Sequence, residues 1–262
     1  MSHMPEKNDA SLIYQYLTPE MVLNAVESLG IDCDGRLQAL NSFENRVYLV
    51  GVNDSADVVA KFYRPRRWSD EQILEEHAFC NELAQLEIPV VKPEEFDGFS
   101  LITVDDFRFA IFQKKGGRAP DLENDDTLEQ LGRFLGRTHA VGKATQFAKR
   151  PELNIETYGI EAREFLLEND FIPADLRTAY ETLTADLLTG IAACYARAGK
   201  VDLIRTHTDF HPGNILWTDS GPHIVDLDDC RHAPACQDLW MLLNGDRTEM
   251  NQSLDAVLEG YT

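Results

Sequence analysis

The stretch His207-Thr-Asp-Phe-His-Pro-Gly-Asn214, followed by Val225-Asp-Leu-Asp228, decides the fold of this chain. Short apolar, β-prone segments flank both stretches: 203–205, 214–217 and 223–225. Polar side chains at the ends of neighbouring short strands lie close together. The sequence therefore predicts a cluster of carboxylate and amide groups on a small island of β-structure.

Such a cluster suits phosphoryl transfer, which requires few reactive protein groups. A carboxylate must orient the attacking hydroxyl and accept its proton, and oxygen ligands must hold Mg²⁺ against the phosphates. Asp209 suits the first role, while Asn214 and Asp226 suit the second, because Mg²⁺ prefers oxygen to imidazole. We therefore predict Asp209 and Asp226 as catalytic residues, Asn214 and Asp226 as metal ligands, and His207 as a structural residue that bonds the loop backbone.

The chain before the loop is rich in predicted strands. A helix over 19–29 begins at Thr18-Pro19, and a hairpin follows, with strands over 37–40 and 46–50. A third strand, over 57–63, contains Lys61, and the capping box Ser69-Asp-Glu-Gln72 starts a helix that ends at Pro89. A strand over 107–112 completes this part, which predicts a small antiparallel sheet.

After the flexible connector Gln113 to Arg118, the pattern changes to helices over 126–142, 157–168 and 174–198. Asp238 is expected to begin another helix, where it would cap the helix or support the loop through an ion pair, and Trp240 is expected in the core. The connector is the predicted boundary between two lobes.

Composition limits the possible partners. Of 262 residues, 44% are apolar and 26% are charged, which is typical of a folded globular protein. With 24 basic and 45 acidic residues, the formal charge of −21 repels nucleic acid and anionic membranes. No membrane span, secretory signal or C-x-x-C pair is visible. We expect a cytoplasmic protein with reduced thiols and no nucleic-acid or membrane partner; a monomer is the default.

With three further stretches, the loop resembles the aminoglycoside phosphotransferase and choline kinase group of kinase-like enzymes. Within this group, nearly the whole chain is similar to the bacterial stress response kinases. The stretches that carry the resemblance are Leu40 to Tyr48, Lys61 to Trp68 with Ile73 to His77, and Gln237 to Gly245. The resemblance implies an α+β, bilobal protein-kinase-like fold, with a small antiparallel-sheet N-lobe over 1–113 and a mainly helical catalytic C-lobe over 114–262. It also implies Mg²⁺-dependent transfer of the ATP γ-phosphate to serine or threonine hydroxyls of proteins, as part of a stress response.

The resemblance further implies a nucleotide site. Lys61 would grip the α and β phosphates with a helix carboxylate, for which we choose Glu76 over Glu75. Ser42 would lie at the tip of the loop over the phosphates, which lacks a G-x-G-x-x-G pattern here as it does in the resembled family. Backbone groups from Phe112 to Lys114 would contact adenine.

Several alternatives stay open. Lys61 could point to solvent at a sheet edge, and Asp228 could be solvated or lie in the outer shell of the metal. Arg64, Arg66 and Arg67 could form a phosphate patch, although a solvated loop is the simpler interpretation.

The function also has alternatives. A small-molecule hydroxyl kinase, acting on an aminoglycoside, choline or homoserine, is the first of them. A metallohydrolase using His211 with Asp209 and Asp226, or a nucleotide-binding regulator without turnover, is a further interpretation. Leu254 to Tyr261 is still a predicted helix, whereas the family continues through further helices, so the resemblance implies a C-lobe truncated at its C-terminus.

Overall fold

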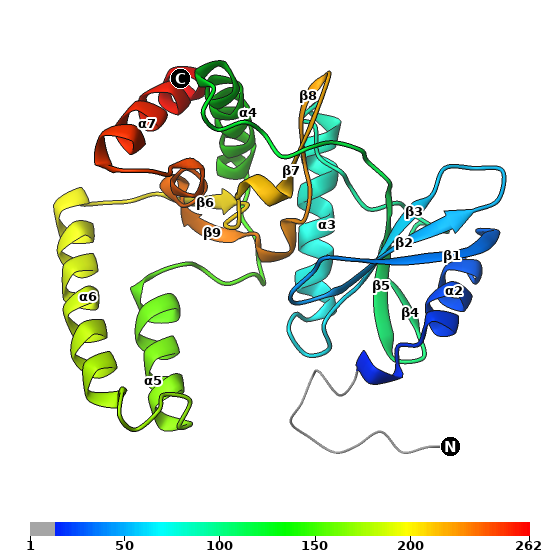
Figure 1. Ribbon diagram of the computed structural model, residues 1–262, viewed down its shortest axis with the longest axis horizontal. Coiled ribbons are helices and arrows are strands. Elements are labelled where there is room, and N and C mark those ends of the chain that lie inside the picture. Colours follow the sequence, from blue (N-terminus) through cyan, green and yellow to red (C-terminus); the bar gives the residue numbers. More distant parts are fainter. Residues whose placement is uncertain (1–13) are drawn as a thin grey trace. The chain divides into compact units, whose positions relative to one another are not determined.

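The computed structural model describes residues 14–262 (Figure 1). The chain forms two compact units, each built from two segments. Unit 1 comprises residues up to 120 together with 213–228, and unit 2 comprises 121–212 together with 229–262. The predicted lobe limits, 1–113 and 114–262, stay a prediction, and residues 1–13 of the first lobe lie outside the described residues.

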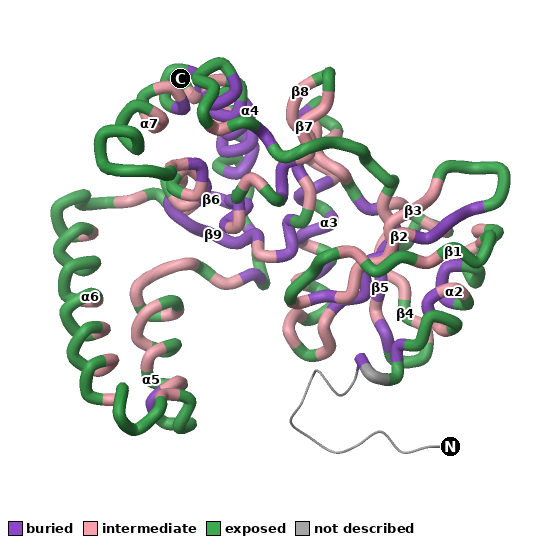
Figure 2. Tube along the Cα trace, viewed as in Figure 1, coloured by how far each residue is buried: buried purple, intermediate pink, exposed green. Residues whose placement is uncertain are grey.

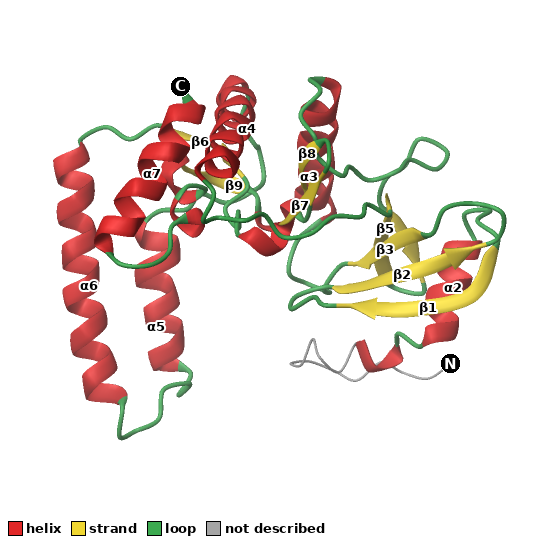
Figure 3. Cartoon of the chain, turned by 45° about the horizontal axis from the view of Figure 1, so that its top comes forward, coloured by secondary structure: helices red, strands yellow, loops and turns green. Residues whose placement is uncertain are grey.

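Unit 1 is built on a five-stranded antiparallel sheet with the order β1-β2-β3-β5-β4 (Figure 3). Its strands are β1 (Cys33–Leu40), β2 (Arg46–Val52), β3 (Val58–Phe62), β4 (Ile102–Val104) and β5 (Phe107–Gln113). The β1–β2 hairpin closes through the pair Leu40–Val47, as its turn-rich linker predicts. Because β3 pairs with β2 on one side and β5 on the other, its Lys61 stands in the middle of the sheet rather than at an edge.

One helix packs on each of two apolar clusters of unit 1. Helix α2 (Pro19–Glu27) is capped by Thr18, whose Oγ1 accepts a hydrogen bond from Met21 N, and it buries Val22 and Val26 with Phe62 and Phe109 of the sheet. Helix α3 (Asp70–Gln85) begins with the predicted capping box between Ser69 and Gln72. A second cluster of Tyr63, Ile73 and Ala110 joins α3 to the sheet.

The segment 213–228 belongs to unit 1 through backbone pairing. It forms the hairpin of β7 (Ile215–Thr218) and β8 (Gly221–Ile224), preceded by the 3-10 turn η3 (Pro212–Asn214) and followed by η4 (Leu227–Asp229). Val91 N donates to Ile224 O at 2.9 Å, and Arg118 N donates to Trp217 O at 3.0 Å. These bonds fix Asn214 and Asp226, which flank the hairpin, to the unit that carries the sheet.

Unit 2 is mainly helical. Its helices are α4 (Asp125–Ala144), the π-helix η2 (Glu156–Ile160), α5 (Glu161–Glu168), α6 (Arg177–Ala198) and α7 (Arg247–Tyr261). A two-stranded sheet of β6 (Leu203–Thr206) and β9 (Arg231–Pro234) lies beside short 3-10 turns, η5 (Ala235–Gln237) and η6 (Trp240–Leu242). Figure 2 shows α4 with a buried face, whereas α6 has no buried residue. The predicted fold class, α+β with an antiparallel-sheet lobe and a mainly helical lobe, is confirmed.

Helices α4 and α7 approach so closely that glycine is required at their contact. A Cβ at Gly260 would lie 1.8 Å from Glu129 O, and one at Gly132 would lie 1.9 Å from Val257 O. Backbone atoms cannot yield as a flexible side-chain tip can, so a methyl group at either position must push the helices apart.

Replacing Gly260 by alanine should therefore destabilise the protein although alanine favours helices. We expect Gly260→Ala to lower the free energy of unfolding by about 1–3 kcal/mol, the usual cost of overpacking. Gly190 of α6, where a Cβ meets nothing within 4 Å, is the matched control. Gly190→Ala should raise that free energy by about 0.5–1 kcal/mol. Urea titrations of both variants measure the difference; a neutral Gly260→Ala would contradict the close packing.

The structure corrects several local predictions. Asp238 does not begin an α-helix but follows the 3-10 turn η5, and Trp240 is 55% exposed rather than in the core. The strands β4 and β9 were not predicted. No disulfide joins the cysteines, all of which lie within residues 14–262. In the same range, no helix combines the length and apolar character needed to cross a membrane.

Candidate functional site

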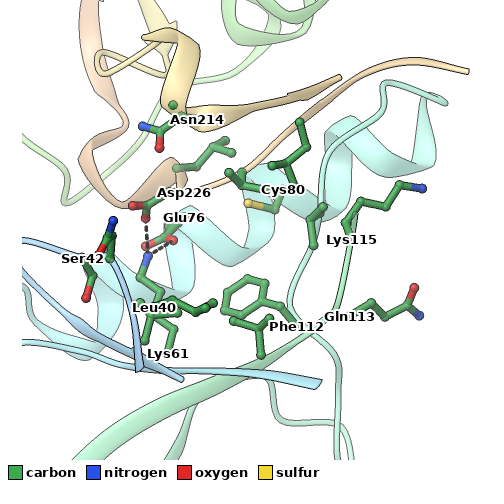
Figure 4. Close-up of a pocket in the computed structure, with 18 residues that line it drawn as sticks. Leu40, Ser42, Lys61, Glu76, Cys80, Phe112, Gln113, Lys115, Asn214 and Asp226 are labelled. Carbon is green, nitrogen blue, oxygen red and sulfur yellow. Dashed lines mark hydrogen bonds and ion pairs between the residues drawn. The ribbon is translucent and has the colours of Figure 1, made fainter. Parts of the chain in front are cut away.

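A pocket in unit 1 brings together most of the predicted site residues (Figure 4). Its cavity measures about 300 Å³. Figure 4 shows Ser42, Lys61 and Asp226 on one side of it and Gln113 and Lys115 on the opposite side. The predicted residues that line it are Ser42, Lys61, Glu76, Phe112, Asn214 and Asp226.

Lys61 is the electrostatic centre of the pocket. Its side chain is 6% exposed, and its Nζ lies 2.9 Å from Asp226 Oδ1 and 3.2 Å from Glu76 Oε1. Figure 4 shows the ammonium between these two carboxylates. Of the two carboxylates considered on α3, Glu76 is therefore the one that contacts Lys61. A lysine so deeply buried requires such partners, because an unpaired buried charge is costly.

The surroundings keep Lys61 charged. Burial lowers the pKa of Lys61, but the carboxylates of Asp226, Asp228 and Glu76 act in the opposite direction, and the net pKa lies well above the ordinary value. Tyr63 directly follows β3, and its pKa is raised mainly by burial and secondly by the charge of Glu76. Its hydroxyl lies 2.7 Å from His77 Nε2. Lys61 therefore carries its positive charge inside the pocket, next to the carboxylates of Glu76 and Asp226.

The loop Asn41 to Asn45, here called the phosphate loop, borders the pocket through Asn41 and Ser42. Ser42 Oγ donates to Asn45 O at 2.9 Å and closes the turn. Asn45 is buried, and its Oδ1 accepts a hydrogen bond of 3.0 Å from Arg64 N. Side-chain bonds therefore hold this glycine-free loop in shape.

Asn214 and Asp226 provide oxygen donors on the pocket wall. Val225 N donates to Asn214 O at 3.1 Å, which holds the two segments together. Asp226 has a φ of 59°, an uncommon value for a residue other than glycine and one that is enriched at functional sites. One carboxylate and one amide oxygen are the donor types that Mg²⁺ uses when substrate phosphates supply further ligands, so these residues fit that ion. Within residues 14–262, no group of three or more His, Cys, Asp or Glu residues is placed to hold a metal ion.

Asp228 and Arg67 extend the site beyond the residues predicted for it. Asp228 is buried, with Oδ1 3.4 Å from Lys61 Nζ and Oδ2 paired with Arg67 Nη1. The expectation that Arg67 lies in a solvated loop is wrong, since its side chain is only 21% exposed. The spacing Asp226-x-Asp228 was visible in the sequence, but the pairing of Asp228 with Arg67 was not.

The far end of the pocket differs in one residue from the prediction. Phe112 lines the pocket, as do Gln113 and Lys115, but Lys114 does not. Lys114 Nζ lies 2.8 Å from Asp57 Oδ2. The Lys114 side chain thus pairs with the residue that precedes β3. The contact of the Lys114 backbone with adenine stays a prediction.

Asp209 belongs to unit 2, on a loop that follows β6. The buried carboxylate of Asp238 holds this loop: His207 N donates to its Oδ2 at 2.9 Å and Thr208 N to its Oδ1 at 2.7 Å. Thr208 has a φ of 64°, which such bonds must stabilise. Asp238 thus supports the loop, as considered from the sequence, but through two backbone amides.

The support of the loop extends to two helices. His139 of α4 places Nε2 3.0 Å from Asp238 Oδ2 and Nδ1 2.7 Å from the hydroxyl of Tyr261 of α7. His207 acts within the loop, because its Nδ1 accepts a hydrogen bond of 3.3 Å from Asp209 N, in keeping with its predicted structural role. His211 Nε2 lies 3.6 Å from Asp209 Oδ2. The loop before Asp209 is therefore rigid, while the Asp209 side chain is 41% exposed.

Comparison with known proteins gives the family. The model of the phosphotransferase enzyme family matches residues 36–262. Stress response kinase A of Escherichia coli strain K12 is 42% identical over 97% of this chain and 76% of its own length. The serine/threonine protein kinase RdoA of Salmonella typhimurium is also 42% identical, with the same coverage.

Solved structures share the fold at lower identity. A complex of amicoumacin kinase with AMP-PNP and Ca²⁺ has a TM-score of 0.74 and is 21% identical. The alignment covers 92% of this chain and 76% of the amicoumacin kinase chain. Spectinomycin phosphotransferase with ADP has a TM-score of 0.67, is 15% identical and covers 92% of this chain and 79% of the other. The predicted resemblance and enzyme class are confirmed: the chain belongs to the phosphotransferase enzyme family, among relatives of stress response kinase A, and is a kinase.

Proposed function

We propose that the chain uses Mg-ATP to phosphorylate serine or threonine hydroxyls of proteins. The observation that carries the proposal is the buried contact of Lys61 with Glu76 and Asp226 in a pocket that Asn214 also lines. The relatives at 42% identity are named as protein or stress response kinases, which supports a protein acceptor and a role in stress. The solved small-molecule kinases, at 21% identity or less, share only the fold.

The pocket suits a nucleotide with its phosphates at Lys61. The ammonium would neutralise phosphate charge, and Glu76 would hold it in position. Ser42 and the phosphate loop would cover the phosphates. The base would lie near Phe112, where Gln113 and Lys115 border the cavity.

Asn214 and Asp226 would hold Mg²⁺, and the ion would neutralise phosphate charge. Asp226 contacts Lys61, so the magnesium ligand and the lysine would approach the phosphates from the same side of the pocket. Asp209 would orient the acceptor hydroxyl and take up its proton. These roles follow the resemblance and remain proposals.

Label transfer from ATP tests the acceptor class. The protein is incubated with γ-labelled ATP and Mg²⁺, alone, with a general protein substrate, and with a panel of aminoglycosides and amino alcohols. Label on protein serine or threonine supports the proposal. Label on a small alcohol alone would overturn the protein acceptor and favour the small-molecule kinase, while nucleotide binding without transfer would indicate a regulator.

The role of Asp226 has a separate test. Asp226→Ala should abolish the Mg²⁺-dependent part of ATP binding, measured by calorimetry with and without Mg²⁺, because an alanine provides no oxygen ligand. Asp219→Ala, in the turn between β7 and β8, is the matched control and should bind like the wild type. Unchanged Mg²⁺ dependence in Asp226→Ala would refute its assignment as a ligand.

A further inference from the structure

The turn between β3 and α3 contacts two parts of the pocket at once. At its start, Arg64 N bonds Asn45 Oδ1 at 3.0 Å, and Arg64 Nη1 pairs with Glu44, so the turn holds the phosphate loop. At its end, Arg67 Nη1 pairs with Asp228. Residues 64–67, here called the arginine turn, therefore connect the phosphate loop with the segment that carries Asp226.

The charges around Lys61 explain why an arginine is needed there. Its Nζ lies 2.9 Å from Asp226, 3.2 Å from Glu76 and 3.4 Å from Asp228. If Asp226 binds a divalent ion, the carboxylates of Glu76 and Asp228 remain beside the cations Lys61 and Arg67. These four groups form the pairs Lys61–Glu76 and Arg67–Asp228. Without Arg67, the charge of Asp228 would no longer be balanced by the guanidinium and would attract Lys61 more strongly, at a site where low dielectric strengthens the attraction.

We propose that Arg67 and Asp228 are positioning residues for nucleotide binding. Arg67 neutralises Asp228, so that the Lys61 ammonium stays directed at the phosphates instead of moving closer to the Asp228 carboxylate. The same turn fastens the phosphate loop through Arg64. The inference rests on the proposed nucleotide site and adds two residues to it that act through Lys61 and the loop.

The proposal predicts a rescue that a purely structural contact would not give. Arg67→Gln should raise the dissociation constant for Mg-ATP by about tenfold, because Asp228 then competes for Lys61. Adding Asp228→Asn should restore it to within about threefold of the wild type, since the competing charge is removed. Arg67→Lys, which retains the charge, should also stay within about threefold.

Calorimetry with Mg-ATP on the full chain provides the measurement, and thermal melting without ligand reports the fold. Arg177→Gln is the matched control: Arg177 also pairs with carboxylates, those of Asp170 and Glu181, but lies in α6. It should bind like the wild type. If Arg67→Gln does not fold, the double variant and Arg67→Lys carry the test, and both must bind within about threefold of the wild type.

Four results would overturn the proposal. Unchanged affinity in Arg67→Gln would show that the arginine has no influence on Lys61. A double variant as weak as Arg67→Gln would mean that Arg67 acts otherwise, for example by contacting the phosphates itself. If the wild type does not bind Mg-ATP, or if Lys61→Ala leaves its Mg-ATP affinity unchanged, the proposed nucleotide site is refuted, and the inference with it.

Discussion

Asp209→Ala should reduce turnover by about 10²–10⁴-fold, the usual contribution of a positioned general base. Mg-ATP affinity should stay within about twofold, because the residues that line the pocket all belong to unit 1 and Asp209 does not line it. The variant therefore separates chemistry from binding. Label transfer at saturating ATP measures the first, and calorimetry measures the second.

Two companion variants sharpen this result. Asp209→Asn retains the shape of the side chain but cannot accept the proton, so it should be nearly as inactive as the alanine variant. His211→Ala removes a neighbour whose Nε2 lies 3.6 Å from Asp209 Oδ2 and should retain most of the turnover. Wild-type turnover in Asp209→Asn would refute the assignment of Asp209 as the proton acceptor.

Asp238→Ala should lower the free energy of unfolding by about 3–5 kcal/mol, the range seen when one partner of a buried charged network is removed. Asp238 is completely buried, and the alanine removes the acceptor of the His207 and Thr208 amides and the carboxylate that contacts His139 Nε2. Turnover should also fall, because the loop before Asp209 loses its support. Urea titration measures the first effect and label transfer the second.

Asp246 offers a control with the same number of backbone contacts. Its carboxylate accepts hydrogen bonds from Thr248 N and Glu249 N at the start of α7, but it is exposed. Asp246→Ala should therefore cost only about 1 kcal/mol, as is usual for a helix cap. Equal losses in Asp238→Ala and Asp246→Ala would contradict a special role for burial at the loop.

The structure also explains which predictions from sequence were sound. The capping box at Ser69, the cap at Thr18 and the β1–β2 hairpin were predictable, because each depends on residues within a few positions of one another. Most of the strands and helices followed from the same local patterns, although β4 and β9 did not. The resemblance added the predicted role of Lys61 at the phosphates, which no local pattern could supply.

Side-chain contacts over long sequence distances could not be predicted in this way. Lys61 could have been a lysine at a sheet edge until the pairing of β3 with both β2 and β5 placed it inside. Lys114 and Lys115 follow β5 as neighbours, yet Lys115 lines the pocket whereas Lys114 contacts Asp57. Only the path of the backbone after the strand distinguishes them.

By itself, the sequence determined the carboxylates and amide of the loop from His207 to Asn214, the lysine strand and the capped helix that follows it. The tertiary structure showed the contact of Lys61 with Glu76, the carboxylate predicted for it, and it alone decided that Arg67 pairs with Asp228 and that Asp238 holds the loop amides. The physical reason is that a buried charge must find its partners in three dimensions. Those partners come from elements that are brought together only when the sheet, the β7–β8 hairpin and the helices pack.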